Sequence, residues 1–374
     1  MPKRILISPT AFKGSLSAIE VAKTIKLALD SLNLDFSCEL APIADGGDDT
    51  ASVANFYFKK SKFVKTTVCD PLMRKIESSW LLLDKETAVI ELAKASGITL
   101  LKEEELNPMW ANTFGTGELI LSALDKGCTK IIITLGGSAT VDAGLGILEA
   151  LGVKLLDKKG HQLKPGGGFL GSIDKIDLSH LDKRIQKIKL YVLCDVKIPL
   201  LGEKGTVQKF SAQKGAKEGE RFILENGMKH FAEFVKKITN CDYEMEPMVG
   251  AAGGVAFSLK AFLGAELFSG FSYLANMTFL EDKIKNADLI ITGEGNLDSQ
   301  TLMGKAVYEL GKLASKYKKK VIVLCGNYDE SINWTTYNID SIVKIKPDEI
   351  TLQESLIKAR DLIEKAVKSN MNCL

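Results

Sequence analysis

The sequence KIIITLGGSAT, at residues 130–140, sets a β-branched apolar run directly before a glycine-rich turn. The run 130–134 predicts a buried strand, because it is short and rich in residues that favour strands. Residues 288–295, DLIITGEG, repeat the pattern. In open α/β sheets, ligands bind beyond the carboxyl ends of the strands, where glycine allows tight turns and close backbone approach. The two stretches therefore predict an α/β fold whose binding site lies at strand ends.

Other short apolar runs alternate with amphipathic segments, which is typical of α/β architecture with parallel strands. The segment 17–32 predicts a helix, with Ser17 as its N-cap and Glu20 completing a capping box. Further helices are expected at 117–126, 217–238, 305–317 and 352–368. Further strands are expected at 4–8, 38–43, 63–69, 77–83, 88–92, 189–193, 320–324 and 342–345.

The length and the spacing of these elements predict more than one domain. A chain of 374 residues suits two domains or three. Residues 60–95 contain three strand candidates with no helix between them, and residues 160–215 are rich in Gly, Pro and Lys. We expect a two-lobed α/β protein. A discontinuous Rossmann-like parallel-sheet lobe would comprise residues 1–80 plus 285–374, with a second α/β lobe, residues 81–284, inserted into it.

The composition excludes several classes of protein. The 49 Lys and Arg nearly balance the 47 Asp and Glu, giving a net charge of +2, so no nucleic-acid partner is expected. The seven cysteines include no C-x-x-C pair, which is typical of cytosolic proteins and argues against disulfide or zinc frameworks. The longest apolar region, 250–268, contains Lys260 and Glu266, and the N-terminus shows no signal-peptide core. We expect a cytoplasmic protein without a membrane partner.

Familiar catalytic motifs are missing. A P-loop ending at Gly304-Lys305 would need glycine where Ser299 stands, and a dinucleotide fingerprint starting at Gly144 would need glycine where Glu149 stands. The three histidines lie in neither an H-R-D nor an H-E-x-x-H context. These absences argue against P-loop enzymes, Rossmann dehydrogenases, protein kinases and triad hydrolases.

What remains is a set of glycine-rich turns that carry carboxylates, hydroxyls or lysines. Each turn alone could be a helix cap or a close packing contact. Together they supply acids, lysines and anion-binding backbone without an activated His or Cys. Phosphoryl transfer fits this inventory, because it requires positioning, Mg²⁺ and charge neutralisation more than covalent chemistry. The natural acceptor is then a small hydroxylated molecule.

In their order along the chain, these turns resemble those of the type-1 glycerate kinase family, from Pro9 to Gly326. The shared motifs are FKGSLSA at 12–18, ADGG at 44–47, GGSAT at 136–140 followed by Asp142, CDV at 194–196, QKGA at 213–216, GAAGG at 250–254, and ITGEG at 291–295 followed by Asp298, Gln300 and Gly304-Lys305. The resemblance implies a kinase that uses Mg²⁺ and moves the γ-phosphoryl group of ATP to D-glycerate, usually at the 2-hydroxyl, giving 2-phosphoglycerate.

The resemblance also implies roles for individual residues. The residues expected to hold glycerate are Lys13, Ser15, Asp45, Gly46 and Gly47. Those expected to cradle the ATP phosphates are Gly136, Gly137, Ser138, Gly293 and Gly295, with Lys305 neutralising phosphate charge. The expected catalytic residues are Asp195, Asp298 and Lys13, and the expected Mg²⁺ ligands are Asp195 and Glu294. Asp195 leads as either general base or metal ligand.

The chain departs from the family pattern in several places. Thr10 replaces a usual acid, Asp48 and Asp49 stand where Glu-Gly is usual, and Val141 and Ile198 replace asparagines. Because two of these positions fall in candidate substrate turns, a kinase of another small hydroxy acid is the first alternative. A non-catalytic ligand sensor of the same fold is the second, and a Rossmann-like oxidoreductase, which lacks its fingerprint, is the third. The sequence leaves the choice between monomer and homodimer open.

Overall fold

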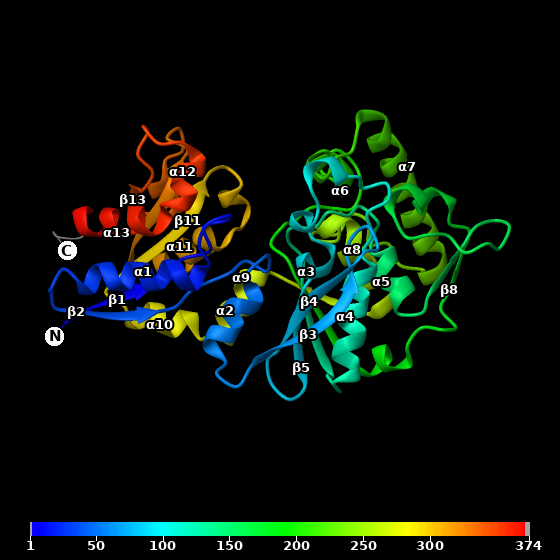
Figure 1. Cartoon of the computed structure of the whole chain (residues 1–374), viewed down its shortest axis with the longest axis horizontal. Coiled ribbons are helices and arrows are strands. Elements are labelled where there is room, and N and C mark those ends of the chain that lie inside the picture. Colours follow the sequence, from blue (N-terminus) through cyan, green and yellow to red (C-terminus); the bar gives the residue numbers. More distant parts are fainter. Residues whose placement is uncertain (1, 371–374) are drawn as a thin grey trace. The chain divides into compact units, whose positions relative to one another are not determined.

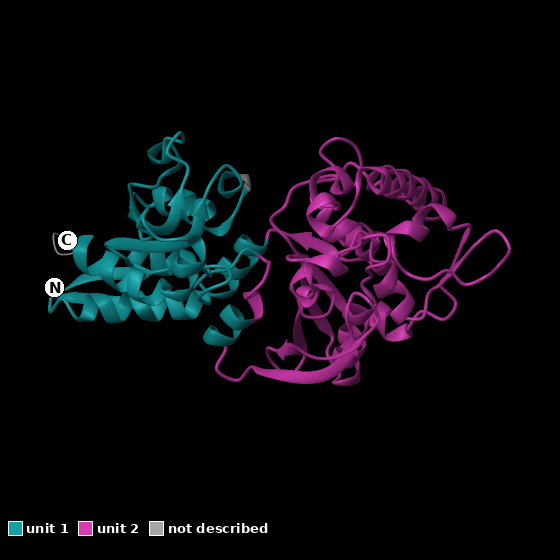
Figure 2. Ribbon diagram, turned by 45° about the horizontal axis from the view of Figure 1, so that its top comes forward, with its two compact units in different colours: residues 1–45, 52–57, 270–374 teal, residues 46–51, 58–269 magenta. Residues whose placement is uncertain are grey.

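The computed structural model describes residues 2–370, apart from the side chain of Met303. The chain forms two compact units: unit 1 comprises residues 1–45, 52–57 and 270–374, and unit 2 comprises residues 46–51 and 58–269 (Figure 1, Figure 2). Each unit is built around its own sheet. The division passes through helix α2 (Thr50–Tyr57).

Unit 1 is centred on a five-stranded parallel sheet. Its strands are β1 (Lys3–Ile7), β2 (Phe36–Leu40), β11 (Leu289–Leu297), β12 (Lys320–Tyr328) and β13 (Ser341–Lys344), in the order β13-β12-β11-β1-β2. Alternate side chains enter different cores, since Ile5 and Ile7 belong to one apolar cluster and Leu6 belongs to another. Helices α1 (Ala18–Asp30) and α13 (Ala359–Asn370) contribute to the first cluster, and α10 (Leu280–Asn286) and α11 (Ala306–Lys316) to the second. Unit 1 is therefore a parallel sheet covered on both faces, as the sequence predicts.

Unit 2 contains a six-stranded mixed sheet. The strands are β3 (Lys62–Cys69), β4 (Lys75–Leu82), β5 (Thr87–Glu91), β6 (Lys130–Thr134), β9 (Lys189–Leu193) and β10 (Glu266–Phe268), in the order β10-β9-β6-β5-β4-β3. Strands β5, β6, β9 and β10 pair in parallel, whereas β3, β4 and β5 pair antiparallel. A large apolar core joins this sheet to helices α4 (Phe114–Asp125), α5 (Leu145–Ala150), α7 (Glu218–Thr239) and α8 (Ala251–Leu263).

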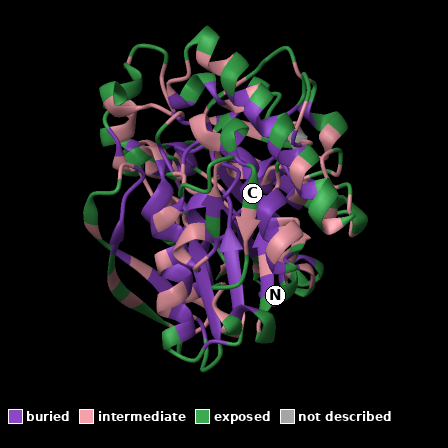
Figure 3. Cartoon of the chain, turned by 90° about the vertical axis from the view of Figure 1, so that its right-hand side faces the viewer, coloured by how far each residue is buried: buried purple, intermediate pink, exposed green. Residues whose placement is uncertain are grey.

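Shorter elements complete the two units. The remaining strands, β7 (Lys154–Leu156) and β8 (Lys175–Asp177), form an antiparallel pair. The remaining helices are α3 (Ala93–Ser96), α6 (Thr206–Phe210), α9 (Gly270–Met277) and α12 (Leu352–Ile357). Turns of 3₁₀ helix cover Ile98–Leu100, Glu103–Glu105, Gly167–Ser172, Lys183–Lys187, Ala212–Lys214, Thr301–Met303 and Trp334–Tyr337. Figure 3 shows the strands largely buried and the outer faces of the helices exposed. None of the helices in the described part of the chain has the length and apolar character needed to cross a membrane.

Most predicted elements are present, and the capping box of α1 is confirmed. The Ser17 hydroxyl accepts a hydrogen bond from the Glu20 N–H, while the Glu20 carboxylate accepts one from the Ser17 N–H at 2.9 Å. The predicted lobes, 1–80 plus 285–374 and 81–284, differ from the observed units at both boundaries: β3 and β4 pair in the sheet of unit 2, and helices α9 and α10 belong to unit 1. The expectation of parallel strands does not extend to these two strands.

Two local predictions were wrong. The turn expected at Gly293 does not exist, because β11 continues to Leu297 and pairs with an equally extended β12. Glycine at 293 lets the strand pass beneath Phe12, since a Cβ there would lie 3.1 Å from the Phe12 ring. The single helix expected at 352–368 is two helices, α12 and α13, which meet at Lys358.

The start of helix α8 is an irregular loop, as the glycines of residues 250–254 suggest. Ala252, Gly253 and Gly254 all have positive φ angles. A Cβ at Gly253 would lie 2.1 Å from the Thr140 carbonyl oxygen. Glycine is therefore required here both for backbone conformation and for close approach to another loop.

We predict that Gly253→Ala destabilises the protein more than Gly264→Ala. Both glycines have positive φ, but a Cβ at Gly264 meets no atom within 4 Å. Gly264→Ala should therefore cost only the left-handed backbone strain, about 1–2 kcal/mol. Gly253→Ala should cost about 1–3 kcal/mol more, because Thr140 must move. Thermal melting of both variants measures the difference, and equal melting temperatures would contradict the close contact.

Candidate functional site

The order of the strands in unit 1 marks one candidate binding edge. The chain adds strands in one direction from β1 to β2 and in the other from β11 to β13, so the order reverses between β1 and β11. Such a reversal leaves a crevice at the carboxyl ends of the strands, where α/β proteins bind ligands. The loop after β1 carries Lys13 and Ser15, and the end of β11 carries Glu294, Gly295 and Asp298.

The loop after β1 is tightly closed. The Phe12 and Leu16 backbones exchange two hydrogen bonds, of 2.8 and 3.0 Å, around Gly14, whose φ is +77°. Lys13 is exposed, whereas the Ser15 hydroxyl donates a 2.7 Å hydrogen bond to the Leu356 carbonyl oxygen. Ser15 therefore links the loop to helix α12. Its hydroxyl oxygen can still accept a hydrogen bond from a ligand.

Glu294 and Lys305 form a partly shielded ion pair after the buried part of β11. The Lys305 ammonium lies 3.2 Å from Glu294 Oε1, and the Thr301 hydroxyl donates to Glu294 Oε2 at 3.1 Å. Burial raises the pKa of Glu294, the charge of Lys305 opposes that rise, and the negative charge of Asp45 adds to it. Glu294 and Lys305, which were expected as a Mg²⁺ ligand and a phosphate neutraliser, therefore pair with each other, and Asp45 acts on the same carboxylate.

Asp298 shapes the loop that returns to Lys305. One of its carboxylate oxygens accepts from the Gln300 and Thr301 N–H groups, at 2.8 and 3.3 Å, and the other accepts from the Asn296 amide at 2.8 Å. These are the contacts of an Asx turn. Gly304, with a φ angle of +110°, allows the chain to turn into Lys305.

In unit 2, Gly47 and Asp48 pack against the GGSAT turn. A Cβ at Gly136 would lie 2.5 Å from the Gly47 Cα, and a Cβ at Gly137 would lie 2.8 Å from Asp48 Oδ1. The sequence placed Gly46 and Gly47 with the acid substrate and Gly136 and Gly137 with ATP. The structure brings Gly47 next to Gly136, and close approach is by itself a reason for glycine at 136 and 137.

Lys214 is a buried residue that the sequence reasoning quoted in the QKGA motif but did not select. Its ammonium donates to Ser138 Oγ and to the Thr140 carbonyl oxygen, both at 2.7 Å. Burial lowers the pKa of Lys214 to about 7, against the smaller effect of the Asp142 charge. Lys214 therefore holds Ser138 and the turn that contains it, and nothing local in QKGA indicates this burial.

Asp142 has a structural role in the same region. Its buried carboxylate accepts hydrogen bonds from the Thr113 N–H and hydroxyl, at 2.9 and 2.8 Å, and from the Gly144 and Gly146 N–H groups. Burial raises the pKa of Asp142, and these hydrogen bonds oppose the rise. Asp142 thus joins the first turns of α4 and α5 beneath the GGSAT turn.

Asp195 lies directly beyond strand β9, in the position expected for a catalytic or metal-binding acid. Its Oδ1 accepts a 2.7 Å hydrogen bond from the Ser269 hydroxyl, just beyond the neighbouring strand β10. Strand β6 pairs with β9 on the other side and ends at the GGSAT turn. Asp195 and this turn therefore share the carboxyl edge of the unit 2 sheet.

Glu91 is a second buried acid that the sequence reasoning did not select. It ends β5, accepts a 3.0 Å hydrogen bond from the Ala51 N–H and lies 3.9 Å from the Lys94 ammonium. Burial raises the pKa of Glu91 to about 7, and the charges of Asp48 and Asp49 contribute to the rise. Asp48, Glu91 and Lys94 line a cavity of about 430 Å³ in unit 2.

The carboxylates do not form a closed metal site. In residues 2–370, no group of three or more His, Cys, Asp or Glu side chains is arranged to hold a metal ion. Mg²⁺ commonly binds one or two carboxylates and completes its shell with water and substrate phosphates. The carboxylates of the candidate site therefore suit a Mg²⁺ ion that binds together with a phosphorylated ligand.

Comparisons with known proteins agree on one family. The model of the glycerate kinase family matches residues 5–374. A glycerate 2-kinase from Escherichia coli K12 is 39% identical over 368 residues, covering 98% of this chain and 96% of that protein. A glycerate kinase from Bacillus subtilis 168 is 37% identical over 367 residues, with the same coverage. The crystal structure of a candidate glycerate kinase 2 from Salmonella typhimurium LT2 superimposes with a TM-score of 0.84 at 34% identity, covering 100% of this chain and 98% of that one.

We predict that Lys214 makes stability rise with pH between its folded pKa of about 7 and its ordinary value of 10.5. In that range the folded state has lost a proton that the unfolded state still binds, so unfolding takes up a proton and becomes less favourable as pH increases. The slope approaches about 1.4 kcal/mol per pH unit.

Lys214→Met removes this proton uptake, so the melting temperature of the wild type should rise relative to that of the variant between pH 7 and pH 9. Lys209→Met, at an exposed lysine of α6, is the control and should follow the wild type. A difference between wild type and Lys214→Met that does not change with pH would contradict the prediction.

Proposed function

Since this chain belongs to the glycerate kinase family, we propose that it transfers the γ-phosphoryl group of ATP, with Mg²⁺, to D-glycerate and gives 2-phosphoglycerate. The match to the E. coli glycerate 2-kinase over 98% of the chain carries the proposal. The positions of FKGSLSA, ADGG, GGSAT, CDV and ITGEG support it, because these motifs lie at the carboxyl ends of parallel strands. Such edges supply charge and backbone donors, which is most of what phosphoryl transfer requires.

The acid substrate would be held by Lys13, Ser15, Asp45, Gly46 and Gly47. Lys13 is exposed and carries the positive charge that a carboxylate needs. The Ser15 hydroxyl hydrogen is committed to Leu356, so this residue would accept a hydrogen bond from a substrate hydroxyl. Asp45 can accept one as well.

Of the residues proposed to bind the ATP phosphates, Gly136, Gly137 and Ser138 belong to unit 2, and Gly293, Gly295 and Lys305 belong to unit 1. Because Ser138 Oγ accepts from Lys214, the hydroxyl hydrogen of Ser138 can point to a phosphate oxygen. Gly295 lines a cavity of unit 1, whereas Gly293 is buried within β11 and would act by leaving room for Phe12.

Asp195 would receive the proton of the acceptor hydroxyl or hold the metal ion, and Glu294 would be the other metal ligand. When bound, Mg²⁺ neutralises charge on the transferring phosphoryl group. Ser269 orients the Asp195 carboxylate, and Thr301 and Lys305 orient that of Glu294. Asp298 stays a proposed catalytic residue, but both of its oxygens accept hydrogen bonds within its own turn, which supports a loop-shaping contribution.

The main alternative is a kinase of another small hydroxy acid. Asp49 has a φ angle of +70°, so it keeps a left-handed backbone at the position where the family pattern has glycine. The substitution therefore changes the charge near Gly46 and Gly47 rather than the course of the chain. The negative charge of Asp49 is the feature of this turn that would favour a different acceptor over glycerate.

Purified protein incubated with Mg-ATP and D-glycerate should release ADP and form 2-phosphoglycerate, identified by NMR of the product. Formation of 3-phosphoglycerate would preserve the kinase reaction and overturn the choice of hydroxyl. If folded protein releases no ADP above the glycerate-free control, a panel of small hydroxy acids tests the alternative acceptor. No turnover with any of them would favour a ligand sensor.

We predict that Asp195→Asn lowers kcat at least about 100-fold, the scale of a general acid–base contribution. The amide keeps the size of the side chain and can still accept from Ser269, so folding should be preserved. Asp174→Asn, at an exposed acid of unit 2, is the control and should retain wild-type kcat. Near-wild-type turnover of Asp195→Asn would remove Asp195 from the mechanism.

A further inference from the structure

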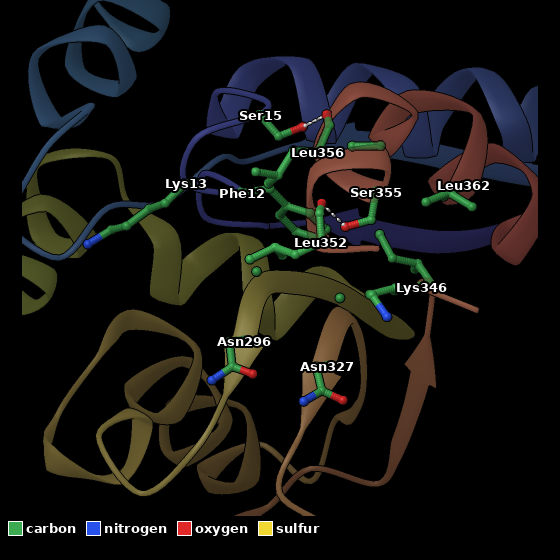
Figure 4. A pocket seen from close by; sticks show the side chains of 14 residues that line it. Phe12, Lys13, Ser15, Asn296, Asn327, Lys346, Leu352, Ser355, Leu356 and Leu362 are labelled. Carbon is green, nitrogen blue, oxygen red and sulfur yellow. Dashed lines mark hydrogen bonds between the residues drawn. The ribbon is translucent and has the colours of Figure 1, made fainter. Parts of the chain in front are cut away.

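A cavity of about 440 Å³ lies within unit 1, beyond the carboxyl ends of its central strands (Figure 4). Its volume falls within the range of about 300–1,000 Å³ that is usual for small-molecule and cofactor sites. The loop after β1, the ends of β11 and β12, the residues after β13, and helices α12 and α13 all contribute to its lining. It therefore occupies the edge at which the strand order reverses.

One side of the cavity is apolar. Helix α12 contributes Leu352 and Leu356, helix α13 contributes Leu362, and the buried residues Phe12 and Ile345 add to the same lining. The hydrogen bond from Ser15 to the Leu356 carbonyl oxygen ties α12 to the loop after β1. The apolar side is thus held in place by an internal contact of unit 1, and it suits an uncharged, flat group rather than a small hydroxy acid anion.

Two asparagines stand at the strand ends of the same cavity. Asn296 of β11 and Asn327 of β12 are paired in register, and Figure 4 shows their amides side by side and pointing the same way. Close packing of the strands brings them together, since a Cβ at Gly326 would lie 2.7 Å from the Gly295 carbonyl oxygen. One amide hydrogen of Asn296 is donated to the Asp298 carboxylate. Its second hydrogen and its oxygen, like the amide of Asn327, match the adjacent acceptor and amino group of adenine.

Two lysines add positive charge. Lys13 and Lys346 both line the cavity, from the loop after β1 and the segment after β13. In Figure 4, Lys13 extends away from the leucines of α12. Because Lys13 is proposed to hold the acid substrate, Lys346 is the lysine that remains for an anionic tail. A ligand with an apolar ring and such a tail has a matching surface for each part.

From these four features we propose that the cavity binds the adenine and ribose of ATP, with the ring against Leu352 and Leu356 and its polar edge facing Asn296 and Asn327. The assignment rests on the proposed function, because that function makes ATP the phosphoryl donor. It adds a site for the nucleoside, whereas the glycine-rich turns account only for the phosphates.

The test compares two tryptophan variants on neighbouring residues of one helix. Leu356→Trp places a large ring in the cavity, whereas Ile357→Trp places it on an exposed residue that does not line the cavity. ADP affinity is measured by calorimetry without any turnover, and KM is measured separately for ATP and for glycerate. Circular dichroism and thermal melting check that each variant is folded.

We expect Leu356→Trp to raise the Kd for ADP and the KM for ATP by about tenfold or more, with the KM for glycerate changed less than about twofold, and Ile357→Trp to resemble the wild type. Asn327→Leu, at an exposed position, removes the amide at similar volume and should also weaken ADP binding. This second variant preserves the test if Leu356→Trp fails to fold.

Unchanged ADP affinity in both Leu356→Trp and Asn327→Leu would overturn the assignment. So would a rise confined to the KM for glycerate, which would give the cavity to the acid substrate. The failure of the proposed function looks different: wild-type protein would bind ADP, lose that binding in Leu356→Trp, and still phosphorylate no hydroxy acid.

Discussion

The carbonyl oxygen of Thr140 is the point at which unit 2 fixes its glycine-rich turn. The buried Lys214 ammonium donates to it, and Gly253 packs directly against it. A buried ammonium is costly unless it is hydrogen-bonded, so Ser138 and Thr140 must face Lys214. Gly136 and Gly137 meet Gly47 and Asp48 on another side of the same turn. The shape of residues 136–140 is therefore set by contacts from several other loops, so a phosphate that binds there, as we propose, would meet a turn that is already formed.

The two cysteines beside proposed site residues are poor nucleophiles. Cys194 immediately precedes Asp195, yet burial raises the pKa of its thiol to about 12. Burial also raises the pKa of Cys325, beside Glu294 in the paired strands. A protonated thiol is a poor nucleophile. The groups with accessible charge are carboxylates and lysines, which can orient a hydroxyl and neutralise phosphate. This inventory suits phosphoryl transfer, which requires positioning and charge neutralisation more than covalent chemistry.

The sequence predicted what depends on local pattern and missed what depends on distant contacts. Strands β6 and β9 have the predicted bounds, and α1 begins at the predicted capping box. The same reasoning placed a turn at Gly293, since a glycine after an apolar run looks alike in a turn and in a strand that passes under Phe12. It could not recognise Lys214 or Glu91, because their burial comes from segments far away in sequence. Asp195 could be proposed because a strand end is a local feature, whereas its hydrogen-bond partner Ser269 could not.

The turn at residues 46–50 shows how a departure from the family pattern can leave the backbone alone. Asp49 adopts the left-handed conformation that glycine would adopt, a conformation that Asp tolerates better than most residues. What changes is charge: the carboxylates of Asp48 and Asp49 both raise the pKa of Glu91, which is buried at the end of β5. The added carboxylate makes this turn less favourable for an anionic ligand. The backbone of the turn nevertheless keeps the shape that it would have with glycine. At this turn, a preference for an acceptor other than glycerate would therefore come from the electrostatics of Asp49 rather than from a rebuilt loop.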